Sequence, residues 1–183
     1  HALAGDSFWG DEILTASFAS RSPAEVIDWT AEDIHPPLYY LLAGGFTRLT
    51  IPLGASQSPD PVSDWLWRFP STIAVVLSVA LTYQLALALK MQDSYSVPLF
   101  AALLLCLAPV GLRYGQEARM HALFMCLSVL STCLLLQAVR RPQAWWRWLA
   151  FSLATAANIY TMYFGFLILA GQTGFLVGTL AAT

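Results

Sequence analysis

Charge is scarce in this sequence. Asp, Glu, Lys and Arg make up 11% of its 183 residues, whereas soluble domains carry about 25%. Hydrophobic residues account for 57%, and the mean hydropathy is +0.60. This composition argues against a soluble domain and predicts a protein that crosses a membrane several times. The net charge of −2 offers no basic surface, so we expect no nucleic-acid partner.

Paired cysteines and nucleotide-binding signatures are missing too. Cys106, Cys126 and Cys133 lie inside apolar runs without paired spacing, which argues against a disulfide framework and a zinc site. No P-loop, GxGxxG or DxD pattern suggests a nucleotide donor. The chain starts at His1 rather than Met and stops inside an apolar run. We therefore expect a fragment of a larger membrane protein that is inactive alone.

Long apolar runs dominate what is present. About 20 such residues cross a bilayer core of about 30 Å. The predicted fold is all-α: a polytopic transmembrane helix bundle at 70–183, preceded at 1–69 by an extracytoplasmic loop with juxtamembrane amphipathic helices. The predicted spans are 70–89, 97–112, 120–139, 145–160 and 163–182.

The first third of the chain contains several signals for helix starts. Ser22 and Glu25 form a capping-box pattern around Pro23. Two prolines after His35 predict a helix over residues 36–49, which is short for a span and is expected to lie at the membrane surface with Arg48 reaching water. Nine of the eleven carboxylates precede residue 65, so this region is the acidic part of the protein.

The number of predicted spans between two segments decides whether they lie on the same side of the membrane. If residues 36–49 do not span, residues 1–69 and the turn at 113–119 lie on one side, and the loop at 140–148 lies on the other. That loop, RRPQAWWRW, combines arginines with interfacial tryptophans, as is typical of a cytoplasmic loop. The polar groups therefore gather outside the cytoplasm.

Three stretches could carry chemistry. Asp11 and Glu12 are adjacent at a helix start, where they could simply complement the helix dipole. His35 could be no more than a neighbour of the next helix start. Arg119 precedes the span that begins near Met120, so a guanidinium and free helix N–H groups converge there. This arrangement favours a phosphate site, although Arg119 could also serve only as a helix-end anchor.

Taken in order, these stretches resemble the membrane glycosyltransferases of the C superfamily. The branch they are most similar to contains the protein O-mannosyltransferases and the lipid A aminoarabinose transferase. The motifs are WGDE at 9–12, HPPLYYLL at 35–42, RFPS at 68–71 and YGQEARM at 114–120. NIYTMYFG at 158–165 resembles a further segment, in which Met162 replaces a histidine. The resemblance extends over nearly the whole chain.

This resemblance implies a function. The protein would transfer a sugar, with inversion, from a polyprenyl-phosphate carrier to a protein, lipid or glycan acceptor. It would be a multi-pass protein of the bacterial inner membrane with its site facing outward. No cofactor is implied, although Asp11 and Glu12 could together hold a divalent cation. Asp11 would be the catalytic carboxylate with Glu12 beside it, and the substrate-binding residues would be His35, Tyr114, Glu117, Arg119 and Tyr163.

Two alternatives remain at this point. A transporter or flippase for lipid-linked sugars would also need arginines near headgroups and a carboxylate in a wet cavity. Such a protein more often carries charge or broken helices in mid-membrane. A non-catalytic membrane subunit with the same fold is the second alternative.

Overall fold

The computed structural model describes residues 10–50, 61–89 and 95–181, and within these ranges the regular structure is entirely helical. The predicted all-α class is therefore confirmed. In chain order the helices are α1 (Gly10–Ala19), α2 (Pro23–Ala31), α3 (Leu38–Thr50), α4 (Pro61–Ala88), α5 (Ser96–Leu107), α6 (Pro109–Tyr114), α7 (Met120–Arg140), α8 (Trp145–Thr161) and α9 (Gly165–Ala181).

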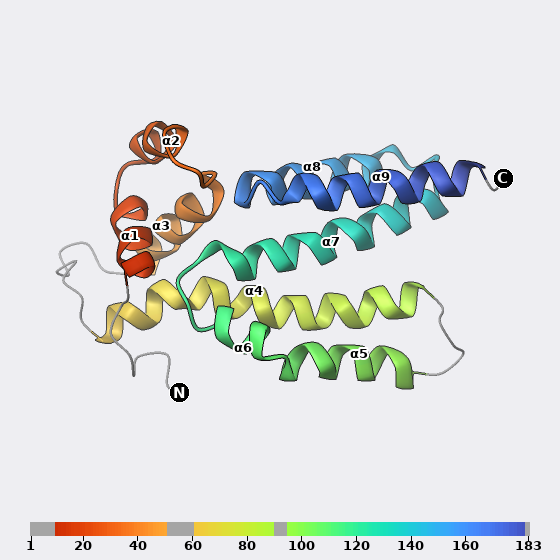
Figure 1. The fold of residues 1–183 in the computed structure, drawn as a ribbon, viewed down its shortest axis with the longest axis horizontal. Helices are drawn as coiled ribbons and strands as arrows, with labels where there is room; N and C mark the ends of the chain where they lie inside the picture. The colour runs from red at the N-terminus through yellow and green to blue at the C-terminus, as the bar shows by residue number, and fades with distance from the viewer. Residues whose placement is uncertain (1–9, 51–60, 90–94, 182–183) are drawn as a thin grey trace.

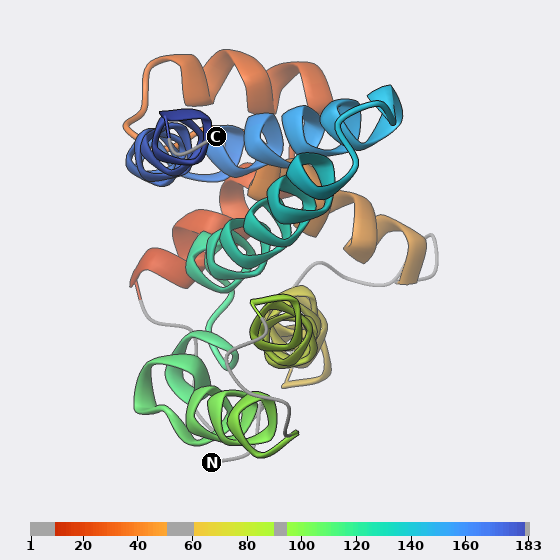
Figure 2. The ribbon, with the colours of Figure 1, turned by 90° about the vertical axis from the view of Figure 1, so that its right-hand side faces the viewer.

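The long helices run side by side, and the short helices α1–α3 gather at one end of them (Figure 1). Seen along the bundle, α7 lies between α4 and α8 (Figure 2). Helix α5 packs beside α4, and α9 packs beside α8. The starts of α4 and α7 are at the same end as α1–α3 (Figure 1), so distant parts of the sequence meet there.

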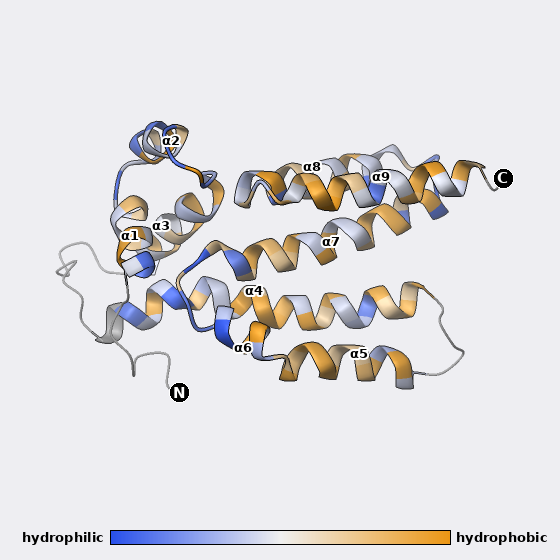
Figure 3. Ribbon diagram, viewed as in Figure 1, coloured by the Kyte–Doolittle hydropathy of each residue, from blue (hydrophilic) through white to orange (hydrophobic). Residues whose placement is uncertain are grey.

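Hydropathy follows this division. Apolar residues colour most of the long helices, and polar residues concentrate near α1, α2 and the start of α7 (Figure 3). Among the described residues, Asp64–Ala88 and Met120–Arg140 are long and apolar enough to cross a membrane. Helices α5 and α9 are apolar but shorter. Two of the predicted spans thus coincide with helices of spanning length, and the other three fall on helices of at most 17 residues.

The run predicted to span at 97–112 is not one helix. Helix α5 ends at Leu107, Ala108 is extended with ψ at 126°, and α6 starts at Pro109. A residue before proline avoids the helical region because of the proline ring, and proline itself fits the first position of the next helix. Hydropathy alone is blind to this break, since all the residues around it are apolar.

The predicted helix starts in the first third are confirmed. The Ser22 hydroxyl accepts from the Glu25 N–H, and the Glu25 carboxylate accepts from the Ser22 N–H at 2.9 Å, which is a complete capping box. Helix α3 starts just after the two prolines. Arg48 is exposed, as predicted, but its guanidinium also donates to the carbonyl oxygens of Ala19, the last residue of α1, and of Arg21 in the connection to α2. It therefore satisfies a helix-end carbonyl that lacks an intrahelical partner.

Aromatic packing joins the short helices to the bundle. Phe18 of α1 stacks on Tyr40 of α3, with 5.2 Å between ring centroids. Trp67 of α4 and Met120 of α7 belong to the same buried cluster. This cluster fixes α1 and α3 against the starts of α4 and α7.

Polar contacts tie the later helices together. The Asn158 amide of α8 donates to the Ser128 hydroxyl of α7 at 3.1 Å. The Gln172 amide of α9 donates to the hydroxyls of Ser131 and Thr132, also on α7. In apolar surroundings such hydrogen bonds fix the orientation of each helix about its own axis. A helix turned away would leave a buried polar group without a partner, which raises the free energy of the folded state.

Gly44 marks the closest approach of α1 and α3. A Cβ at this position would overlap with the carbonyl oxygen of Ala19, whereas one on the adjacent Gly45 would meet nothing within 4 Å. We predict that Gly44→Ala lowers the free energy of unfolding by about 1–3 kcal/mol, because the two helices must move apart. Denaturant unfolding of the purified protein in detergent measures this change.

Gly45→Ala is the matched control. It should leave stability unchanged or raise it by about 0.5–1 kcal/mol, since alanine is the better residue in a helix interior. Equal stability of the two variants would contradict the close packing of α1 on α3.

Candidate active site

A buried ion pair forms the base of the site. Glu12 is 0% exposed and Arg68 is 4% exposed. The Arg68 guanidinium donates to both carboxylate oxygens of Glu12, through Nε to Oε1 at 2.8 Å and through an Nη to Oε2 at 2.7 Å. The backbone N–H of Ala118 donates to the same Oε1 at 2.8 Å. One carboxylate therefore joins α1, α4 and the turn between α6 and α7.

Asp11 and Arg119 form a second pair beside the first. An Arg119 Nη lies 2.9 Å from Oδ2 of Asp11. The Asp11 side chain is 47% exposed and that of Arg119 is 19% exposed, so water reaches this pair but not the Glu12–Arg68 pair. The two pairs are neighbours in the sequence as well as in space. Asp11 directly precedes Glu12, and Arg119 directly follows Ala118, whose N–H donates to Glu12.

Helix α4 holds the turn that carries Arg119. The Thr72 hydroxyl donates to the carbonyl oxygen of Gly115 at 2.8 Å, and the Ser71 hydroxyl donates to that of Arg119 at 3.2 Å. Ser71 also bonds the Tyr39 hydroxyl at 2.8 Å. Since the Ser71 proton is directed at Arg119, Tyr39 is the donor of that bond. The backbone at both ends of the turn is thus fixed.

Helix α7 starts directly after Arg119. This residue has the extended conformation of an N-cap, with φ at −139° and ψ at 157°, and its side chain makes no capping hydrogen bond. The first N–H groups of a helix lack intrahelical partners and carry partial positive charge. A guanidinium and the positive end of a helix therefore lie together beside the Asp11 carboxylate.

Glu117 pairs with Arg113 rather than with Arg119. The Arg113 Nε donates to Oε1 of Glu117 at 2.9 Å. The second oxygen, Oε2, is buried and has no hydrogen-bond partner among the described residues. The Glu117 side chain is only 13% exposed, so this carboxylate lies mostly in the interior of the turn.

The other residues predicted for the site differ in their settings. His35 lies in the loop before α3, with Nδ1 3.4 Å from Oδ2 of Asp33. The Tyr114 ring packs against the His121 ring, with 4.5 Å between centroids. Tyr163 is 54% exposed in the turn between α8 and α9, and no described contact joins it to Asp11 or Arg119. Its neighbour Met162 packs against the cluster that contains Tyr39 and Tyr40.

Two nearby residues escaped the sequence reasoning. Arg68 is part of RFPS but had no predicted role, although a charge at the start of an apolar helix was a signal for one. Tyr40 is part of HPPLYYLL and likewise had no predicted role. Burial and the nearby Asp33 carboxylate raise its pKa to about 12, while Arg119 acts in the opposite direction. Its phenol thus stays protonated at neutral pH. It also lies close enough to the charges of Arg119 and Asp11 to be affected by them.

Metal ligands do not converge in the described part of the chain. No group of three or more His, Cys, Asp or Glu side chains that could hold a metal ion occurs in those ranges. Asp11 already contacts a guanidinium, and Glu12 is enclosed by Arg68 and Ala118. The described cations and carboxylates are thus arranged to neutralise one another.

Apolar helices with a polar cluster at one end define a class of membrane-embedded helical proteins. Within that class, residues 34–182 match a family described as dolichyl-phosphate-mannose-protein mannosyltransferase, and the chain belongs to this family. The resemblance to membrane glycosyltransferases is thereby confirmed. The match includes Arg68 and Arg119 but begins after Asp11 and Glu12. Searches of curated proteins and of solved structures found no significant match.

The buried Glu12–Arg68 pair leads to a testable prediction about the stability of the fold. Glu12→Gln removes the carboxylate charge from a buried ion pair, so we predict a loss of about 3–5 kcal/mol in the free energy of unfolding. Asp28→Asn, an exposed change on α2, should stay within about 0.5 kcal/mol of the parent. Denaturant unfolding in detergent measures both variants.

A double-mutant cycle with Arg68→Met isolates the pair itself. The two single changes should be strongly non-additive, because either one alone already removes the charge–charge contact between Glu12 and Arg68. Additive losses would show that the Glu12–Arg68 contact contributes little.

Proposed function

We propose that this protein is a glycosyltransferase that moves a sugar from a polyprenyl-phosphate carrier to an acceptor outside the cytoplasm. Mannose is the sugar in the description of its family. The observation that carries the proposal is the 2.9 Å contact between Asp11 and Arg119. A partly exposed carboxylate that can accept a proton and a cation at a helix N-terminus that can bind a phosphate thus lie in the same site.

Asp11 acts as the base in this scheme. The acceptor hydroxyl gives its proton to the Asp11 carboxylate while its oxygen attacks the anomeric carbon of the sugar. The bond between the anomeric carbon and the phosphate oxygen breaks, and the polyprenyl phosphate leaves with the electron pair. Attack from the face opposite the phosphate inverts the configuration. Protonated Asp11 then releases its proton to water, which restores the base.

Arg119 stabilises the leaving group. The departing phosphate gains negative charge, and a fixed guanidinium with helix N–H groups offers charge-assisted hydrogen bonds to it. The backbone of Arg119 is held by Ser71 and, one residue earlier, by Glu12. Such donors need no rearrangement as the charge develops, which makes them effective in the transition state.

Glu12 serves as a positioning residue in this proposal. It is fully buried, so it does not reach a substrate, but it orients the helix that carries Asp11 and the turn that carries Arg119. We retain Glu117, His35, Tyr114 and Tyr163 as proposed substrate contacts; for Glu117 this requires its buried Oε2 to become accessible when the substrate binds.

Arg119 and the start of α7 balance the phosphate charge in this proposal, and no step uses a metal ion. We further propose a multi-pass protein of the bacterial inner membrane whose site faces outward. Helices α1–α3 and the starts of α4 and α7 share one end of the bundle (Figure 1), and the arginine-rich segment 140–148 follows the far end of α7. This distribution supports that orientation. The acceptor, whether protein, lipid or glycan, belongs to the same proposal.

The catalytic base is tested by Asp11→Asn in the full-length protein. Transfer from dolichyl-phosphate-mannose should fall by about 10²–10⁴-fold, because the amide takes no proton. Donor affinity should change little, since Arg119 remains. Asp28→Asn on α2 is the matched control and should transfer at the parental rate. Normal turnover of Asp11→Asn would remove Asp11 from the role of base.

The phosphate contact is tested by Arg119→Ala. We expect donor affinity to fall by about 10- to 100-fold, the loss of one or two charge-assisted hydrogen bonds. Calorimetric titration of the nanodisc-reconstituted protein with the donor measures this. Arg141→Ala, at an exposed arginine after the far end of α7, should bind like the parent. Unchanged affinity of Arg119→Ala would return Arg119 to the role of a helix-end anchor.

A further inference from the structure

A basic and aromatic patch lies at the end of the bundle opposite the candidate active site. Helix α7 ends there and α8 begins there (Figure 1), and polar residues reappear at their connection (Figure 3). We call this surface the arginine–tryptophan patch. It consists of Arg140, Arg141, Trp145, Trp146 and Arg147.

No described acid balances the positive charge of the patch. In the described ranges, no carboxylate side chain lies between Asp64 and Glu117, and none follows Glu117. Lys90 and Asp93, in the connection from α4 to α5, lie outside the described residues, and their opposite charges leave the net charge of this end unchanged. Three guanidinium groups therefore meet the membrane surface without a described counter-charge.

Helix-end carbonyls hold two of these guanidinium groups in place. Arg140 donates through an Nη to the carbonyl oxygen of Ala88, at the end of α4. Arg147 donates through an Nη to the carbonyl oxygen of Gln137 at 2.9 Å, and its guanidinium lies 5.0 Å from the centroid of the Trp146 ring. A guanidinium has five N–H donors, so each carbonyl contact uses only part of the group.

Capping of helix ends does not account for Arg141. This residue is exposed, and its side chain has no hydrogen bond or ion pair within the described part of the chain. Beside it, Trp145 is 72% exposed and Trp146 is 53% exposed. Exposed indole rings next to arginines are typical of the layer in which lipid headgroups lie.

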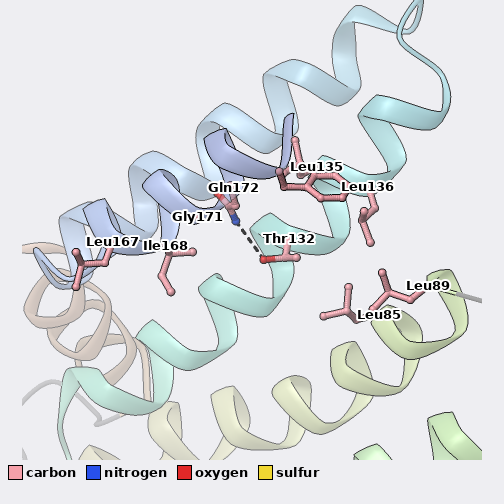
Figure 4. A pocket seen from close by; sticks show the side chains of 10 residues that line it. Leu85, Leu89, Thr132, Leu135, Leu136, Leu167, Ile168, Gly171 and Gln172 are labelled. Atoms are coloured by element: carbon pink, nitrogen blue, oxygen red, sulfur yellow. Dashed lines mark hydrogen bonds between the residues drawn. The ribbon is translucent and has the colours of Figure 1, made fainter. Parts of the chain in front are cut away.

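The patch begins where the aliphatic surface of the bundle ends. The last turns of α4 and α7 contribute leucines to an apolar groove, which Figure 4 shows: Leu85, Leu89, Leu135 and Leu136. Arg140 follows Leu136 by four residues, which is about one helical turn. The guanidinium groups therefore lie just beyond the apolar part of the bundle, at the expected depth of lipid phosphates.

We propose that the arginine–tryptophan patch binds the headgroup of an anionic phospholipid. Its phosphate would accept charge-assisted hydrogen bonds from the guanidinium groups. A zwitterionic lipid carries the same phosphate, but its own ammonium group offsets the negative charge, so the patch prefers an anionic lipid.

This lipid site is separate from the proposed donor site. Arg119 and Arg141 flank the 21 residues of α7, which are about 30 Å long. The lipid at the patch therefore lies in the other leaflet from the donor phosphate, and its binding does not depend on sugar transfer.

Native mass spectrometry of the full-length protein in detergent measures lipid binding. The probes are dioleoylphosphatidylglycerol, which is anionic, and dioleoylphosphatidylcholine, which is zwitterionic and has the same acyl chains. We expect the parent to bind the anionic lipid at least about tenfold more tightly. Arg141→Gln should weaken binding of the anionic lipid by about three- to tenfold, the contribution of one arginine near a membrane surface, and leave the zwitterionic lipid unaffected.

Arg113→Gln is the matched control. It removes the same charge from an exposed arginine at the other end of the bundle, where Glu117 already pairs with it. This variant should bind both lipids like the parent. Thermal unfolding of Arg141→Gln in detergent should also match the parent, because no described side-chain contact is lost.

Three results would overturn the proposal. Equal affinity of the parent for the two lipids would show that the patch does not select an anionic headgroup. Parental affinity of Arg141→Gln for the anionic lipid would leave the arginines as helix caps alone. A loss in Arg113→Gln as large as that in Arg141→Gln would show that the lipid responds to the net charge of the protein and not to this patch.

Discussion

The site depends on the carboxylate of Glu12. A buried charge is tolerated only when hydrogen bonds and a counter-charge replace its water, and Arg68 and the Ala118 N–H supply them. The two partners come from α4 and from the α6–α7 turn, so the Glu12 carboxylate joins these two segments to α1. Asp11 precedes Glu12 and Arg119 follows Ala118, so the buried pair brings the exposed pair into contact.

Helix α4 is the template for this arrangement. Arg68, Ser71 and Thr72 lie at positions i, i+3 and i+4, which share one face of a helix. That face bonds Glu12 through Arg68 and the α6–α7 turn through the two hydroxyls. A motif that reads only as the opening of a membrane span therefore also organises the residues proposed for catalysis.

The bundle separates two physical environments along α7. At its start, guanidinium groups, carboxylates and helix N–H groups meet water, as a reaction that develops charge requires. Further along, α7 contributes to an apolar groove and to the polar contacts with Asn158 and Gln172 that hold α8 and α9. The proposed donor has the same two parts, a charged phosphate and a long hydrocarbon chain.

Local signals in the sequence determined the all-helical class, the capping box at Ser22, the start of α3 and the apolar lengths of α4 and α7, because capping, proline geometry and hydropathy act over a few neighbouring residues. The break at Ala108 was within reach of the same rules, but hydropathy concealed it. Tertiary structure alone decided the long-range partners: Arg68 for Glu12 and Asp11 for Arg119. It also decided which of two adjacent carboxylates meets water. Neighbouring residues on a helix point about 100° apart, so Glu12 faces the interior and Asp11 the solvent, and only the packing of α1 fixes which is which.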